Sequence, residues 1–237
     1  MPYFYFDWTY IMLVLPCILL SLWASSSVNS TFQKYSKQLS VRNITGAEAA
    51  QRVLSINGVR GVRIERINGY LTDHYDPKTN VIRLSDNVYA STSTAAIGVA
   101  CHEAGHAVQY DQSYAPIRLR AAIIPITNFG SRIAMPLIMV GILLSFMGNM
   151  SYFFVYLGIA CFGFSLLFQL VTLPVEFNAS RRAMAAIEQT GLLTEEEQRG
   201  ARKTLKAAAM TYVAATAVAL SQLVRLLVIF GGRRRRD

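Results

Sequence analysis

Residues 133–173 read IAMPLIMVGILLSFMGNMSYFFVYLGIACFGFSLLFQLVTL and contain no charged residue. A helix needs about 20 apolar residues to cross a bilayer, so this stretch is long enough for two crossings. Gly148-Asn149 is a turn signal near its middle. The stretch predicts a transmembrane helical hairpin, with helices at about 133–148 and 152–173, and indicates a mainly α-helical membrane protein.

Two further apolar stretches lie at the ends of the chain. Residues 1–24 contain an apolar core from 11 to 23 behind an aromatic cluster, and no Lys or Arg precedes that core. The missing positive charge favours an uncleaved N-terminal transmembrane anchor over a signal peptide. Residues 208–230 carry a single charge, Arg225, and a basic tail follows at 231–237. This last helix either spans the membrane or packs on the bundle, which gives three or four transmembrane or membrane-embedded helices.

The distribution of Lys and Arg predicts the orientation. The chain has a net charge of +9, with twelve Lys and Arg in 25–132, six in 174–207 and none at the hairpin tip. Positively charged segments stay on the cytoplasmic side, so both segments are expected there, in a multi-pass protein of the plasma membrane. If 208–230 crosses the membrane, the tail arginines lie on the opposite side, against this rule.

The basic charge lies mostly beside apolar runs, which favours membrane lipids as partners. No Gly-rich phosphate loop, RNA-binding signature or zinc-finger spacing occurs, so nucleic acid is not expected to bind. Membrane-protein partners or an oligomer would suit the apolar bundle.

The segment 25–132 is expected to be a cytoplasmic catalytic domain. A capping box at 45–48 and the stop signal at 57–58 predict a helix over 46–57. Strand-like residues at 69–74 and 81–84 flank a turn and predict a small β-hairpin or sheet. A helix is expected over about 92–110. A second capping box at 194–197 begins a basic helix within 174–207.

The predicted helix over 92–110 carries the sequence HEAGH at 102–106. His102 and His106 lie one turn apart on one face, so both imidazoles can bind one Zn²⁺ ion. Glu103 can act as general base on a metal-activated water and pass the proton to the leaving amine. The simpler explanation, two histidines packed on a helix, needs a chance match expected in roughly one chain in a hundred.

A catalytic zinc needs a third protein ligand. The extended three-histidine motif is absent, and Glu176 directly follows the predicted hairpin. Two crossings return Glu176 to the membrane side of HEAGH, and Pro174 can begin a new helix there, so Glu176 is the expected third ligand.

Three other side chains are candidates for supporting roles. His74 would stabilise the oxyanion, position the substrate or cap the hairpin turn, and the sequence leaves these roles open. Tyr110 is a second candidate oxyanion donor. Arg225 is a functional candidate because it is charged within an apolar helix, although an internal salt bridge is the favoured explanation.

Three separated motifs resemble those of the YugP-type neutral zinc metallopeptidases, which are bacterial membrane proteins. They are TDHYDP at 72–77, HEAGHAVQ at 102–109 and LPVEFNASRRA at 173–183, and the resemblance covers most of 45–225. It implies a gluzincin-like catalytic domain in which His102, His106 and Glu176 hold one zinc ion and Glu103 is the base.

The layout also resembles, more distantly, the HtpX and CaaX-protease group, in which a membrane hairpin separates HExxH from a Glu-x-x-Ala-Asp helix. Glu176 and Ala179 match that pattern, but Ser180 stands where the group has Asp. Asn178 or Ser180 is therefore expected to support a ligand in place of that Asp.

These observations predict a membrane-anchored zinc endopeptidase that hydrolyses peptides or membrane-protein segments by metal-activated water. An active site beside the bilayer suggests membrane-protein quality control. The alternative is a non-catalytic membrane scaffold or adaptor with a structural zinc, and the intact Glu103 favours the enzyme. No GxxxxGK[ST] loop is present, so no ATPase is expected in the chain. The hairpin lacks the aspartate ligand of site-2-type intramembrane proteases.

Overall fold

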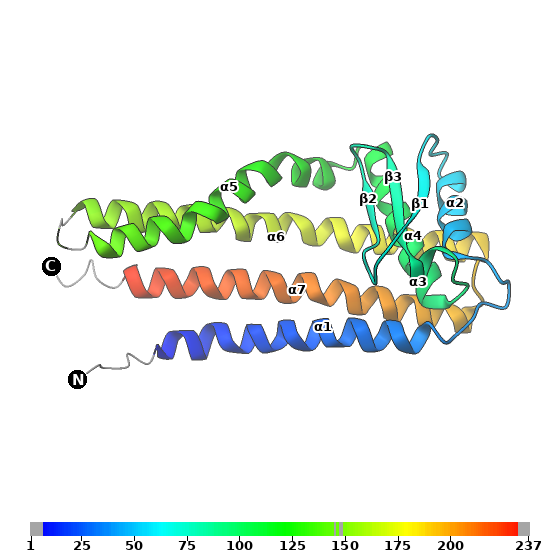
Figure 1. Cartoon of the computed structure of the whole chain (residues 1–237), viewed down its shortest axis with the longest axis horizontal. Coiled ribbons are helices and arrows are strands. Elements are labelled where there is room, and N and C mark those ends of the chain that lie inside the picture. Colours follow the sequence, from blue (N-terminus) through cyan, green and yellow to red (C-terminus); the bar gives the residue numbers. More distant parts are fainter. Residues whose placement is uncertain (1–6, 145, 147–148, 232–237) are drawn as a thin grey trace. The chain divides into compact units, whose positions relative to one another are not determined.

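The computed structural model describes residues 7–144, 146 and 149–231 (Figure 1). The helices are the π-helical η1 (Tyr10–Val14), α1 (Leu15–Tyr35), α2 (Gly46–Ile56), α3 (Asp86–Tyr89), α4 (Thr94–Asp111), α5 (Ala115–Leu143), α6 (Asn149–Thr190) and α7 (Glu195–Gly231). The strands are β1 (Arg63–Ile67), β2 (His74–Asp76) and β3 (Val81–Ser85). This confirms a mainly α-helical protein with a small sheet.

Four helices among the described residues are long and apolar enough to cross a membrane, which supports the predicted membrane fold. They are Tyr10–Tyr35, Ala115–Leu143, Met150–Thr190 and Glu195–Gly231. The predicted turn at Gly148, the aromatic residues before Asp7 and the tail arginines lie outside the described residues.

The chain folds as two compact units. The first takes in Met1–Trp23, Leu119–Thr172 and Tyr212–Asp237, and the second takes in Ala24–Arg118 and Leu173–Thr211. The long helices therefore contribute an apolar part to the first unit and a more polar part to the second. The second unit contains the sheet and the HEAGH segment.

In the first unit, the end of α7 packs on the hairpin helices. Buried Leu226 and Phe230 form an apolar cluster with Ile138, Val155 and Ile159. The 208–230 stretch is thus both long enough to span and packed within its bundle.

Arg225 makes an ion pair with Asp7, to which its Nε donates a hydrogen bond of 3.0 Å. Its guanidinium also lies 5.3 Å from the centroid of the Tyr10 ring. These contacts confirm the internal salt bridge expected for an arginine within an apolar helix. They place the end of α7 beside the start of the first membrane helix.

The sheet has the order β1-β3-β2, with β1 parallel and β2 antiparallel to the buried central β3. The hairpin of β2 and β3 was predicted, but the strand expected over 69–74 is wrong. Gly69 and Leu71 have φ values of 128° and 54°, which interrupt an extended strand, so β2 begins only at His74.

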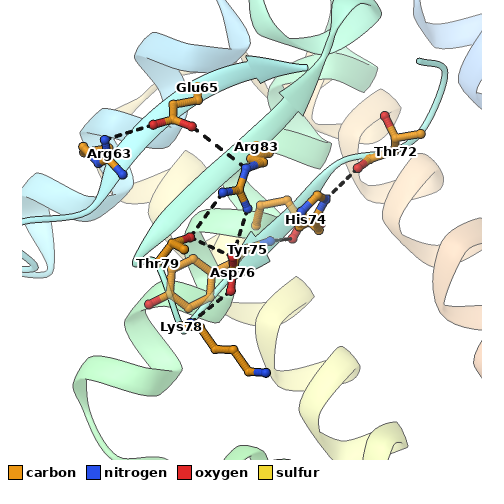
Figure 2. Close-up of polar contacts among 10 residues, drawn as sticks. Arg63, Glu65, Thr72, His74, Tyr75, Asp76, Lys78, Thr79 and Arg83 are labelled. Carbon is orange, nitrogen blue, oxygen red and sulfur yellow. Dashed lines mark hydrogen bonds and ion pairs between the residues drawn. The ribbon is translucent and has the colours of Figure 1, made fainter. Parts of the chain in front are cut away.

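Polar contacts hold the turn between β2 and β3 (Figure 2). Asp76 accepts hydrogen bonds from Thr79 Oγ1 at 2.7 Å, from Arg83 at 3.0 Å and from the Lys78 backbone N–H at 3.0 Å. These bonds, that from Thr79 foremost, hold the pKa of Asp76 well below its usual range. The ionised carboxylate thereby fixes the position of β2, the strand that lies beside the candidate site.

The helix α6 runs through Pro174 without a break, so the prediction that a new helix begins there is wrong. Proline removes one backbone hydrogen bond, but membrane helices tolerate it where neighbouring groups compensate. The continuous helix carries Glu176 directly on from the uncharged stretch. The capping boxes at Thr45 and Thr194 begin α2 and α7 as predicted.

Candidate active site

Two histidines of α4 and one glutamate of α6 converge in the second unit. Glu176 Oε2 lies 3.3 Å from His102 Nε2 and 3.5 Å from His106 Nε2. The three ligand atoms lie within 4.8 Å of one another, and Glu176 is only 3% exposed. Two imidazole nitrogens and one carboxylate oxygen form the donor set of a catalytic zinc site, so this chemistry fits a zinc ion.

The other nitrogen of His106 shows which tautomer the ring adopts. His106 Nδ1 lies 2.9 Å from Gln109 Oε1. The Gln109 amide donates to the Val175 carbonyl at 2.8 Å and to Asn178 Oδ1 at 2.9 Å, so its oxygen must be the atom that faces His106. His106 Nδ1 therefore carries the hydrogen, and Nε2 keeps its lone pair for a metal.

His102 has a comparable support from α6. Its Nδ1 lies 3.1 Å from Ser180 Oγ, which can accept the Nδ1 hydrogen when Nε2 binds a metal. Asn178 is held in turn by Arg182, whose Nε donates to its Oδ1 at 2.7 Å. The two residues expected to support a ligand in place of an Asp thus lie behind different histidines, Ser180 directly and Asn178 through Gln109.

Gln109 and Arg182 were not singled out from the sequence as site residues. The signal for Gln109 was its spacing, three residues after His106 and hence on the same face of α4. Arg182 lies four residues after Asn178 and hence on the same face of α6.

The surroundings of the ligands favour positive charge. Burial alone would lower the pKa of His106, but the hydrogen bond to Glu176 and the charge of Glu103 raise it overall. Two carboxylates beside two imidazoles thus attract a cation, either a proton or a metal ion.

Glu103 lies between the ligands and the sheet. It is 9% exposed, and its Oε2 accepts a hydrogen bond of 3.0 Å from the backbone N–H of Tyr75 in β2. The loop before β2 is fixed by Asp73, which accepts hydrogen bonds from Ser85 N–H at 2.7 Å and from its hydroxyl. Burial raises the pKa of Asp73 overall. A carboxylate held beside the metal ligands in this way can serve as a general base.

The remaining predicted residues lie in different places. His74 is exposed in β2, and its Nδ1 donates to the Thr72 carbonyl at 2.8 Å (Figure 2). The Tyr110 ring lies 5.6 Å from that of Tyr75, so it borders the same strand. Arg225 belongs to the first unit, where it pairs with Asp7.

Gly105 sets the approach of α4 to α6. A Cβ atom at this position would lie 2.8 Å from the carbonyl oxygen of Ala179, which is closer than real contacts allow. The glycine of HEAGH thus lets two helix backbones touch beside the three ligands.

Replacing Gly105 with alanine is expected to destabilise the protein by about 1–3 kcal/mol, because the added methyl group pushes α4 away from α6. Zinc binding should weaken as well, because the ligands lie on both helices. Thermal unfolding with and without zinc measures both effects. Gly163→Ala is the matched control, since a Cβ atom there meets nothing within 4 Å. An unchanged unfolding temperature and zinc affinity in Gly105→Ala would show that the close approach of α4 and α6 at this position is not needed for stability or for zinc binding.

Replacing Ser180 with alanine is expected to weaken zinc binding by roughly 10–100-fold, the usual effect of removing a partner that orients a ligand. Competition with a chelator measures the affinity. Ser180→Asp restores an acceptor for His102 Nδ1 and should retain more affinity than Ser180→Ala. Ser55→Ala on α2 is the control, and equal affinities for all variants would contradict the role of Ser180.

Comparison with known proteins agrees with this geometry. Residues 10–231 match the family model described as "Putative neutral zinc metallopeptidase". The chain is 47% identical over 221 residues to the "Putative membrane protease YugP" of Bacillus subtilis (strain 168), covering 93% of this chain and 96% of that protein. No solved structure matches. Both matches include the membrane helices as well as the His102, His106 and Glu176 cluster, and the chain belongs to this family of neutral zinc metallopeptidases.

Proposed function

We propose that this protein is a membrane-anchored zinc endopeptidase with His102, His106 and Glu176 as ligands of one zinc ion and Glu103 as general base. The observation that carries the proposal is the convergence of the three ligand atoms within 4.8 Å. The two supporting hydrogen bonds, which His106 Nδ1 and His102 Nδ1 donate to Gln109 Oε1 and Ser180 Oγ, add to it because both histidines then present Nε2 to the same point.

When bound, zinc polarises the scissile carbonyl and lowers the pKa of water. Glu103 takes the proton of the attacking water and delivers it to the leaving amine. Its hydrogen bond from Tyr75 N–H holds the carboxylate in position before substrate binds. His74 and Tyr110 are the candidate donors to the oxyanion, because His74 lies in β2 and Tyr110 borders that strand.

We infer that a peptide binds along β2. This strand ends the order β1-β3-β2, and an edge strand can pair with an extended peptide. Tyr75 of β2 contacts Glu103, so a peptide on this strand would lie close to the general base.

The expected position of the active site relative to the membrane leads to a proposal for the substrates. The Lys and Arg distribution favours the cytoplasmic side of the plasma membrane for residues 25–132 and 174–207. A peptidase at that position would act on membrane-protein segments or peptides near the bilayer, which suits quality control.

Removal of the metal distinguishes a zinc endopeptidase from a non-catalytic scaffold with a structural zinc. The protein purified in detergent is expected to contain one zinc ion per chain and to cleave a peptide library. Because the ion polarises the carbonyl, a chelator should abolish cleavage, and added zinc should restore it. Cleavage that persists without metal would contradict the enzyme mechanism. Tightly held zinc without any cleavage would support a scaffold with a structural zinc.

A further inference from the structure

A cavity of about 590 Å³ lies between α6 and α7 in the second unit. Phe177, Arg181 and Met184 line it from α6, and Arg202, Leu205 and Lys206 line it from α7. On α6 the residues are spaced four and three apart, and on α7 Leu205 and Lys206 lie three and four residues after Arg202, so each set lies on one face of its helix. Basic and apolar side chains thus line the cavity together.

The charge of this cavity is positive. Arg181, Arg202 and Lys206 are its charged lining residues, and no carboxylate lines it among the described residues. Arg202 pairs with Glu188 at 2.8 Å. Arg181 and Lys206 are exposed and make no ion pair with any part of the chain that the structure describes. Two cations thus remain to bind an anion.

The cavity lies where membrane helices leave the apolar stretches. Pro174, which lines it, directly follows the uncharged stretch 133–173. Ala209, which also lines it, falls at the start of the apolar stretch 208–230. Residues at these positions are expected at the depth of lipid headgroups, and basic pockets between membrane helices at this depth suit anionic headgroups.

The cavity is not on the substrate side of the metal ligands. Ser180 lines it and contacts Nδ1 of His102, whereas Nε2 of the same ring faces Glu176. The general base Glu103 contacts β2, which does not line the cavity. An occupant therefore lies behind His102, which favours a lipid over the carboxylate of a peptide substrate.

We propose that this cavity binds the headgroup of an anionic phospholipid. Arg181 and Lys206 bind the phosphate oxygens, and Phe177, Met184 and Leu205 contact the glycerol and the first carbons of the acyl chains. The choice of a lipid over a peptide rests on the proposed roles of His102 and Glu103, whereas the cavity and its test involve lipid binding alone.

The test uses the full chain in detergent with added phosphatidylglycerol or phosphatidylcholine, and native mass spectrometry measures the bound lipid. The wild-type protein should retain phosphatidylglycerol in preference to phosphatidylcholine. The double substitution Arg181→Gln/Lys206→Gln should weaken phosphatidylglycerol binding by about thirtyfold, or about fivefold for each charge removed. Met184→Trp, which fills the cavity and keeps the charges, should weaken it as well.

The matched control is Arg199→Gln/Lys203→Gln, which removes the same charge from exposed positions of α7 outside the cavity. Equal losses in both double variants would overturn the proposal, since general attraction to the basic surface would then explain binding. Wild-type binding in Arg181→Gln/Lys206→Gln and Met184→Trp would also overturn it. Displacement of the lipid by millimolar inorganic phosphate would indicate a free-phosphate site, and displacement by an acidic peptide would indicate a peptide site. Zinc content and the unfolding temperature confirm that each variant is folded.

Discussion

Replacing Glu103 with glutamine is expected to lower the rate of peptide cleavage by about 10²–10⁴-fold, while zinc remains bound. Glutamine has nearly the same shape, and its amide oxygen can still accept the hydrogen bond from Tyr75 N–H, which is 3.0 Å long in the structure. The amide cannot take a proton from water at neutral pH. The substitution thus removes the base and leaves its position intact.

Cleavage kinetics of a peptide substrate, together with zinc analysis, measure this effect. Asp111→Asn is the matched control, because it removes a carboxylate from the exposed end of the same helix α4. A Glu103→Gln protein that contains zinc and still cleaves at the wild-type rate would rule out Glu103 as the base. The inactive variant can also trap bound substrates for identification, and recovery of soluble proteins alone would contradict a role in membrane-protein quality control.

Replacing Glu176 with glutamine is expected to lower both zinc affinity and cleavage. A neutral amide in place of a ligand carboxylate should weaken binding beyond the roughly 10–100-fold caused by losing a supporting hydrogen bond. The buried position of Glu176, 3% exposed, leaves little room for water to replace the lost oxygen. The loss of cleavage follows from the loss of metal.

Chelator competition and cleavage at saturating zinc distinguish the two glutamates. Glu103→Gln should keep zinc and lose cleavage, whereas Glu176→Gln should lose zinc and regain part of its activity at high zinc. Glu188→Gln on the same helix is the control, because its side chain is exposed and pairs with Arg202. Wild-type zinc affinity in Glu176→Gln would exclude Glu176 as the third ligand.

Local sequence patterns predicted much of the fold. The uncharged stretch predicted two hairpin helices, because only apolar helices satisfy their backbone within a bilayer. It did not predict their lengths, since α5 already begins at Ala115 and α6 continues to Thr190. The capping boxes at Thr45 and Thr194 marked the starts of α2 and α7, since capping depends on residues only three apart. The predictions failed at Pro174 and over 69–74, where helix packing and residues with positive φ override the local pattern.

The sequence by itself determined that His102 and His106 lie one turn apart on one face and that Glu103 projects beside them, because helix geometry alone sets these positions. Only the tertiary structure brought Glu176 to the two imidazoles, across the backbone contact at Gly105, and paired Gln109 and Ser180 with their Nδ1 atoms. The physical reason is the sequence separation over which each interaction acts. Hydrogen bonds within a helix join residues four apart, whereas His106 and Glu176 are 70 positions apart, and only the packing of α4 on α6 brings such residues together.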